Sequence, residues 1–239
     1  MGLVETNAIV LKNYSLSESD KIVLFLTQNH GLVRGVAKGA RRLKSRFGSG
    51  LEPLSIVTLG YFEKEQRELV SINNIELQES YFVKASDVSL LTRFSYLIGL
   101  LTEFLPPNDP DEVLFRMTRA CHVAVETNNL DFITIYFEIW LLKQSGYLPN
   151  FSKCFKCDIS FNASDNQVFT NLFEVACFNC VKKEGKRVIQ ARERLVIGQI
   201  MKLSPAEFCL IAADKDYAED IDRISSITQL IISNTIGNK

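Results

Sequence analysis

The first 80 or so residues contain short apolar segments separated by turn signals, and no sustained helical period occurs among them. Between the second and third segments, Asn29 and Gly31 tolerate the positive φ of a tight hairpin turn. Five strands are therefore expected, at residues 4–14, 20–28, 32–38, 51–61 and 68–78. Five short strands of this total length predict a small closed barrel. The size suits an OB-fold, although composition alone does not separate it from an SH3-like barrel.

The hydrophobic period changes after residue 85. From Leu90 to Leu105 apolar residues recur three or four positions apart, as a helix with one buried face requires, and Pro106 ends the run. A second helix is expected to begin at Asp109, and a third helix is expected to end near Gly146. The short connections between these helices predict antiparallel packing. Three more helices are expected. One spans residues 191–202, one begins at a capping box formed by Ser204, Pro205 and Glu207, and one spans residues 220–234.

Four of the six cysteines form two Cys-x-x-Cys pairs, Cys154 with Cys157 and Cys177 with Cys180, separated by nineteen residues. This spacing matches zinc ribbons with four cysteine ligands. The two-residue gap lets both thiolates of a pair face one tetrahedral ion, and residues 158–176 are long enough for a hairpin that joins the pairs. Four thiolates leave no position for an activating water, so we expect a structural Zn²⁺ site. Iron in a rubredoxin-like site and accidentally buried thiols are the alternatives.

The remaining cysteines, one histidine and the apolar residues between the cysteine pairs are given structural roles. The two remaining cysteines, Cys121 and Cys209, lie on apolar faces of predicted helices and are expected in the core. His122 is expected at the surface or partly buried. The small core of the cysteine hairpin is expected to contain Phe161, Val168, Phe169, Leu172 and Phe173.

The predicted fold class is α+β with several domains. We expect a five-stranded OB-fold barrel at residues 1–80 and an α-helical domain made of residues 81–150 and 185–239. A four-cysteine, zinc ribbon-like module at residues 151–184 is inserted into that helical domain.

The formal net charge is −1, but positive charge is concentrated in one segment. No acid occurs between Asp20 and Glu52, where the basic residues are Lys21, Arg34, Lys38, Arg41, Arg42, Lys44 and Arg46. Glycines in this segment let the backbone approach a phosphate chain that the long side chains can reach, and Phe47 is a candidate for stacking on a base. An isolated run of charge is usually an incidental, solvated loop. Because this basic segment lies in a small barrel, phosphate binding is favoured instead.

The sequence offers little for catalysis or for a membrane. His30 and His122 are the only histidines, and neither a phosphate-binding loop, a dinucleotide fingerprint nor a His-Glu-x-x-His helix occurs. We therefore expect a protein that is not an enzyme. No apolar run approaches the roughly 18 residues of a membrane span, and the start has the pattern of a strand rather than a signal peptide. A cytoplasmic location, where thiols stay reduced, is the expectation.

Several segments occur in the order found in a known protein family. They are Ala8-Ile9-Val10-Leu11, Tyr14 with Ser19-Asp20, Leu24-Phe25-Leu26-Thr27 before Gly31, Val36-Ala37-Lys38-Gly39-Ala40-Arg41, Leu54, Trp140-Leu141-Leu142, Gly146, Pro149, Cys154 and Cys157. With these residues, most of the chain resembles the RecO family of bacterial recombination mediators. The chain departs from the family pattern at Glu174-Val175-Ala176, where a glycine is usual, and in the short, weakly basic tail after Ile236.

The resemblance implies a protein that binds single- and double-stranded DNA and anneals complementary strands. It also implies action with RecR, and sometimes RecF, to load RecA onto DNA coated by single-strand-binding protein, in association with the nucleoid. Carried over by position, DNA binding falls on Lys38, Arg41 and Arg42, with Arg34, Lys44 and Arg46 as weaker candidates. The metal role falls on Cys154, Cys157, Cys177 and Cys180.

In that family the acidic C-terminal tail of single-strand-binding protein docks on the helical domain. The positive charge for such a tail could come from Arg93, Arg116, Arg119 or Lys143, each of which is equally well explained as an exposed helix charge. Two other functions are open. A non-catalytic adaptor would capture a peptide in its helical domain while the basic loop is incidental, and a zinc enzyme would require an open metal coordination site.

Overall fold

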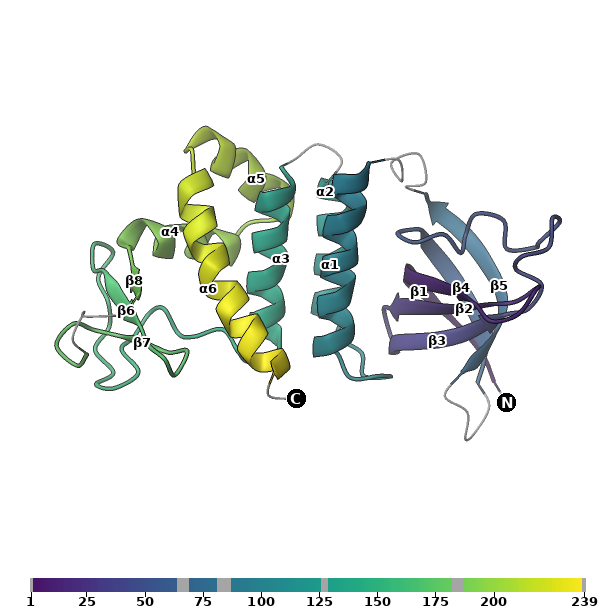
Figure 1. Cartoon of the computed structure of the whole chain (residues 1–239), viewed down its shortest axis with the longest axis horizontal. Coiled ribbons are helices and arrows are strands. Elements are labelled where there is room, and N and C mark those ends of the chain that lie inside the picture. The colour runs from purple at the N-terminus through teal and green to yellow at the C-terminus, as the bar shows by residue number, and fades with distance from the viewer. Residues whose placement is uncertain (1, 64–68, 81–86, 126–128, 182–186, 238–239) are drawn as a thin grey trace. The chain divides into compact units, whose positions relative to one another are not determined.

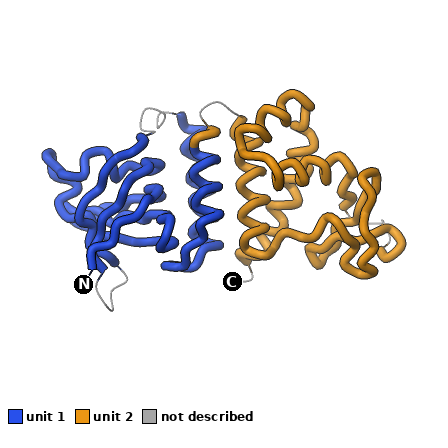
Figure 2. Tube along the Cα trace, turned by 180° about the vertical axis from the view of Figure 1, so that it is seen from behind, with its two compact units in different colours: residues 1–122 blue, residues 123–239 orange. Residues whose placement is uncertain are grey.

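The structure is a computed structural model that describes residues 2–63, 69–80, 87–125, 129–181 and 187–237 (Figure 1). The chain divides into two compact units, residues 1–122 and residues 123–239 (Figure 2). The predicted limits of the barrel, helical and cysteine-rich domains, at residues 80, 150 and 185, stay a prediction. None of the described helices is both long and apolar enough to cross a membrane.

Five strands close into a barrel in the first unit, as predicted. They are β1 (Leu3–Ser15), β2 (Lys21–Thr27), β3 (Gly31–Ala37), β4 (Ile56–Phe62) and β5 (Val70–Glu79). The strand order around the barrel is β1-β2-β3-β5-β4, and β4 pairs with β1 to close it. Only β3 and β5 run parallel, and this is the topology of an OB-fold.

The fourth strand is shorter than predicted. It begins at Ile56 rather than at residue 51, because Pro53 has no N–H to donate to a ladder and Leu54 takes a positive φ of 72°. The Leu54 N–H instead donates to the Val10 carbonyl over 2.8 Å, so the turns before β4 are bonded to β1.

Alternate residues of the strands fill the barrel, as the two-residue period of a strand requires. The interior contains Ala8, Val10, Val23, Phe25, Val33, Ala37, Val57, Leu59, Tyr61 and Ile72, joined by Phe47 and Leu51 from the β3–β4 connection. All of them are almost fully buried, so this connection is part of the barrel core and not only a surface loop.

Two helices, α1 (Val88–Phe104) and α2 (Glu112–Ala124), follow the barrel. Their connection lies against the β2–β3 turn, where the Asn108 N–H donates to the Leu32 carbonyl over 3.2 Å. Gly31, at φ 63°, is required there because a Cβ atom would lie 2.3 Å from the Asp109 carbonyl oxygen. The prediction for His122 was wrong, since its ring is 2% exposed and packs edge-on against Phe94.

The second unit contains α3 (Leu130–Gln144), α4 (Ala191–Ile200), α5 (Pro205–Asp214) and α6 (Ala218–Gly237). Helix α3 is buried on most sides because α4, α5 and α6 all pack against it. The predicted capping box is present, with the Ser204 N–H donating to Glu207 and the Glu207 N–H donating to the Ser204 hydroxyl. Cys209 lies in the core, 3% exposed, as predicted.

A small three-stranded sheet completes the second unit. It consists of β6 (Gln167–Phe169), β7 (Val175–Ala176) and β8 (Arg187–Ile189), in the order β7-β6-β8. The antiparallel β6–β7 pair is the predicted hairpin between the cysteine pairs. The third strand was not predicted, because three residues are too short to show a period.

Candidate metal centre and nucleic-acid interface

Two tight turns and strand β7 bring the four paired cysteines together. In the first turn the Asp158 N–H donates to the Cys154 carbonyl over 2.9 Å, and in the second the Cys180 N–H donates to the Cys177 carbonyl over 3.1 Å. The Phe155 N–H donates to the Val175 carbonyl and thereby fixes the first turn against β7. The four Sγ atoms consequently lie within 4.8 Å of one another.

The arrangement fits a tetrahedral metal ion with four sulfur ligands. Zn–S bonds of about 2.3 Å place the sulfur atoms of such a site about 3.8 Å apart. The Sγ atoms of Cys157 and Cys177 are separated by 3.8 Å. Within the described ranges, this is the one group of three or more Cys, His, Asp or Glu side chains close enough to hold a metal ion.

The electrostatics of the cluster also favour a cation. Burial raises the pKa of the Cys154 thiol, but N–H groups of Cys177, Lys156 and Cys157 donate to its sulfur, and the net result is a pKa of about 6. The neighbouring sulfur atoms of Cys157 and Cys177 raise the pKa of Cys180 to about 12. Four sulfur atoms this close do not all ionise unless a cation offsets their repulsion, so metal binding would release protons.

The turn before the second cysteine pair forms without the glycine that is usual in the resembling family. Phe173 takes the positive φ of 60°, and the Thr170 hydroxyl accepts hydrogen bonds from the N–H groups of Leu172 and Glu174. Leu172 lies at the tip of this turn, 70% exposed, so its predicted place in the hairpin core was wrong. Val168 and Phe169 are buried as predicted, and Phe161 packs against the cysteine core.

The six basic residues from Arg34 to Arg46 are all exposed. The segment that carries them is fixed at one end to the β1–β2 turn, because the Gly39 N–H donates to the Asp20 carboxylate over 2.8 Å. Arg41 is attached to the same turn through its own N–H, which donates to the Ser19 carbonyl, and through its guanidinium, which donates to the Ser17 carbonyl. Sequence reasoning missed this role of Asp20, which it used only as the edge of the acid-free segment and as part of the family resemblance.

Two basic residues differ from the others. Lys21 forms an ion pair with Glu52 over 3.4 Å, so its charge is partly compensated. The Arg46 guanidinium lies 4.9 Å from the centre of the Phe47 ring and donates to the Ile72 carbonyl, so Arg46 partly braces the barrel.

The proposed stacking role of Phe47 was wrong. Its ring is 4% exposed and belongs to the barrel core, where no base can reach it. Among residues of the same loop, Leu43 is the opposite case, since its side chain is fully exposed between Arg42 and Lys44.

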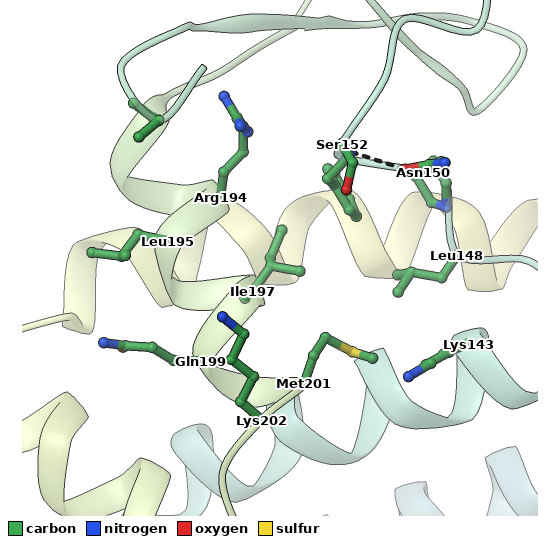
Figure 3. A pocket seen from close by; sticks show the side chains of 15 residues that line it. Lys143, Leu148, Asn150, Ser152, Arg194, Leu195, Ile197, Gln199, Met201 and Lys202 are labelled. Atoms are coloured by element: carbon green, nitrogen blue, oxygen red, sulfur yellow. Dashed lines mark hydrogen bonds between the residues drawn. The ribbon is translucent and has the colours of Figure 1, made fainter. Parts of the chain in front are cut away.

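The second unit contains a pocket of about 640 Å³ between α4 and residues 148–152 (Figure 3). Its apolar lining includes Leu148, Ile197 and Met201, and no acidic residue of the described ranges lines it. Among the residues that the structure describes, the cationic side chains of Lys143, Arg194 and Lys202 line it.

These three cations are not equally available to a ligand. Arg194 donates to the carbonyls of Asn162 and Asp165, so its guanidinium is engaged, whereas Lys143 and Lys202 are exposed. Of the residues suggested for an acidic tail, Arg116 pairs with Glu112 and Arg119 with Glu79, and Lys143 lines this pocket.

Comparison with known proteins identifies the family of the chain. The model of the recombination protein O N-terminal domain matches residues 1–81, and that of its C-terminal domain matches residues 85–239. A protein of Clostridium novyi named DNA repair protein RecO is 26% identical over 241 residues, which cover 100% of this chain and 91% of that protein. A protein of the same name from Thermoanaerobacter sp. is 32% identical over 187 residues, or 77% of this chain and 73% of that protein.

The matched length varies among the relatives. A protein of Koribacter versatilis, also named DNA repair protein RecO, is 28% identical over 155 residues, which span 65% of this chain and 64% of that protein. The two domain models, in contrast, together account for nearly every residue of the chain. This chain therefore belongs to the recombination protein O (RecO) family.

Proposed function

We propose that this chain is a recombination mediator in DNA repair, which binds single- and double-stranded DNA and anneals complementary strands. Together with RecR, and in some cases RecF, it would help to load RecA onto DNA coated by single-strand-binding protein. The observation that carries this proposal is the exposed basic loop on an OB-fold barrel. Membership of a family whose relatives are named DNA repair proteins supports it. Such a protein would act in the cytoplasm at the nucleoid.

The basic loop supports annealing without any covalent chemistry. Lys38, Arg41 and Arg42 lie where the loop leaves the barrel and is fixed to the β1–β2 turn, so their charges are held near a defined surface. Cations that neutralise the phosphates of one strand also lower the repulsion that its complement meets. The weaker candidates Arg34, Lys44 and Arg46 would extend the same charged surface.

Annealing of complementary single strands tests the proposal directly. The native chain is compared with an Arg41→Glu, Arg42→Glu variant and with a control, Arg116→Glu, Lys215→Glu, that makes the same charge change at exposed sites elsewhere. We expect fast annealing by the native chain and the control, and strongly reduced annealing by the loop variant. If four to six phosphates are neutralised, log affinity for single strands falls with log salt at a slope of about −3 to −4. Equal annealing by both variants would reject this site.

We propose that the cysteine cluster holds Zn²⁺ and that the ion stabilises the fold instead of taking part in a reaction. The four sulfur ligands support this, because they complete a tetrahedral shell and leave no position for a substrate or water. Elemental analysis of the purified protein should find one zinc ion per chain. Iron in its place, or a cobalt-substituted protein whose spectrum lacks four thiolates, would overturn the assignment.

A second candidate function is peptide capture, and the pocket beside α4 favours it. An apolar pocket with two exposed lysines, and with no acid among its described lining residues, suits a peptide that combines acidic residues with an apolar anchor. We propose that the acidic tail of single-strand-binding protein binds there. A synthetic tail peptide should bind the native chain and bind a Lys143→Glu, Lys202→Glu variant at least tenfold more weakly. Peptide binding by a native chain that neither binds nor anneals DNA would favour the adaptor function.

A further inference from the structure

The outer surface of the first three strands carries a row of side chains that the barrel core does not use. The strand register pairs Tyr14 with Ile22 and Ile22 with Val36, so these three side chains lie side by side across β1, β2 and β3. They point outward because their chain neighbours Val23 and Ala37 point into the barrel. Tyr14 is 53% exposed, and Ile22 and Val36 are partly exposed. The row is therefore an aromatic ring beside an accessible apolar surface.

Cationic side chains flank this row on the same face. Lys12 lies two residues before Tyr14 on β1, and Arg34 occupies the equivalent position before Val36 on β3, since both are in register with Leu24. Lys38 follows Val36 at the same spacing where β3 ends. Asp20, an acid close enough to Lys38 to interact with its charge, also accepts hydrogen bonds from the Gly39 N–H and the Ser19 hydroxyl.

We propose that Tyr14 is a base-stacking residue for single-stranded nucleic acid, with Ile22 and Val36 beside it and Lys12, Arg34 and Lys38 contacting the phosphates on either side. The inference rests on the DNA-binding function proposed above and names the strand form that this face binds. An aromatic ring bordered by cations matches the alternation of base and phosphate in a single strand. A duplex cannot use the ring in this way, because its bases are already stacked and paired.

The position of the row supports the same conclusion. Figure 1 shows β1, β2 and β3 as neighbouring strands of the barrel wall. The basic loop begins directly after β3 ends at Ala37, so Lys38 is its first residue. The β1–β2 turn that follows Tyr14 is bonded to Gly39 and Arg41 of that loop. A single strand of DNA whose phosphates contact Arg41 and Arg42 therefore has a base-stacking site nearby on the same wall of the barrel. Phe47 does not fill this role, because it is buried.

Substitution of Tyr14 tests the inference. Affinities for a single-stranded oligonucleotide and for its duplex are measured by fluorescence anisotropy over a range of salt concentrations. We expect Tyr14→Ala to weaken single-strand binding by about 5- to 150-fold, the range for loss of one base–aromatic stack, while Tyr14→Phe stays close to native. Duplex affinity should change less than about twofold, and the salt slope should not change, because no charge is removed.

Two controls keep the result specific to the ring. Leu16→Ala removes an apolar side chain of similar exposure, 49%, from the turn that follows Tyr14 and should leave both affinities unchanged. If Tyr14→Ala lowers the melting temperature, Tyr14→Leu preserves apolar volume without an aromatic ring and should show the same loss. An oligonucleotide with a 2-aminopurine base should lose its stacking-induced quenching in Tyr14→Ala and keep it in Tyr14→Phe.

The outcomes separate this inference from the proposed function. Equal losses on single strands and duplex, or a Tyr14→Phe variant as weak as Tyr14→Ala, would overturn the stacking role. A Tyr14→Ala variant that binds single strands as tightly as the native chain would also overturn the stacking role. If that variant and the native chain still bind DNA in a salt-dependent way, the proposed function stays intact. A native chain that binds no DNA at low salt would remove the proposed function and this inference together.

Discussion

In the cysteine cluster four sulfur atoms converge to within 4.8 Å of one another, whereas the six basic residues from Arg34 to Arg46 are exposed and spread over the end of β3 and the loop after it. A convergent site fixes the charge, the number and the geometry of what it binds. A divergent site fixes little more than the sign of the charge. Removing one ligand should therefore abolish the first site, while removing one base should only weaken the second, and the two regions should respond to substitution in different ways.

The largest effect is expected from Cys154→Ser, which removes the ligand that is completely buried. Structural zinc sites have apparent binding free energies of about 10–16 kcal/mol, which rival the stability of a whole domain. We expect the variant to lose its metal and the sheet of β6, β7 and β8 to lose hydrogen-exchange protection, while the barrel keeps its own. Cys209→Ala, which removes a buried thiol outside the cluster, should keep one metal per chain. Full metal content in Cys154→Ser would contradict the four-ligand site.

The next largest effect is expected from Phe47→Ala, which tests whether the basic loop is also part of the barrel core. Because Phe47 is 4% exposed, its truncation should lower the free energy of unfolding by about 3–5 kcal/mol, as in other buried phenylalanines. Urea unfolding measures this loss. Phe155→Ala, at a ring 37% exposed beside the cysteines, should cost much less. Unchanged stability with weakened single-strand binding in Phe47→Ala would restore the stacking role that the structure contradicts.

The same contrast explains what the sequence could predict. The spacing of the two Cys-x-x-Cys pairs is enough to predict the four metal ligands. The period of the apolar residues is enough to predict the strands of the barrel. A loop has no period, so nothing in the sequence shows that Phe47 turns inward while Leu43 turns outward. The late start of β4 depends on Leu54 adopting a positive φ, which leucine rarely does.

Long-range contacts were equally hidden. His122 is buried because it meets Phe94 on another helix, and Asp20 anchors the basic loop because the pairing of β2 with β3, which sets Lys21 opposite Ala37, brings Gly39 beside it. The exposure of Tyr14 beside Ile22 and Val36 needs the register of three strands, which sequence reasoning does not supply. Composition located the charge, but only the structure shows which side chains share a surface.

A smaller effect should separate two bases within the loop. Arg46 lies over the Phe47 ring and donates to the Ile72 carbonyl, so Arg46→Ala should lower stability by about 0.5–1 kcal/mol as well as weaken DNA binding. Lys44→Ala, at an exposed position in the same loop, should leave the stability unchanged. If each contacts one phosphate, each variant should make the salt slope for single strands less steep by about 0.7. Equal stabilities of the two variants would show that Arg46 does not brace the barrel.

The smallest effect concerns the pH dependence of the loop anchor. The Gly39 N–H and the Ser19 hydroxyl donate to the Asp20 carboxylate, and together with Lys38 and Arg42 they lower its pKa below the ordinary value of 3.8. Since the folded pKa is lowered, the stabilisation is complete above the unfolded pKa of about 3.9 and is lost as the pH falls through the folded value. The Gly39 amide resonance should therefore titrate with a midpoint below 3.8, together with the Asp20 carboxyl carbon. In Asp20→Asn, which keeps an acceptor but does not ionise, that transition should disappear. A Gly39 midpoint at or above the ordinary value would mean that the loop is not held by this carboxylate, and the defined position assigned to Arg41 would then depend on its bonds to Ser17 and Ser19 alone.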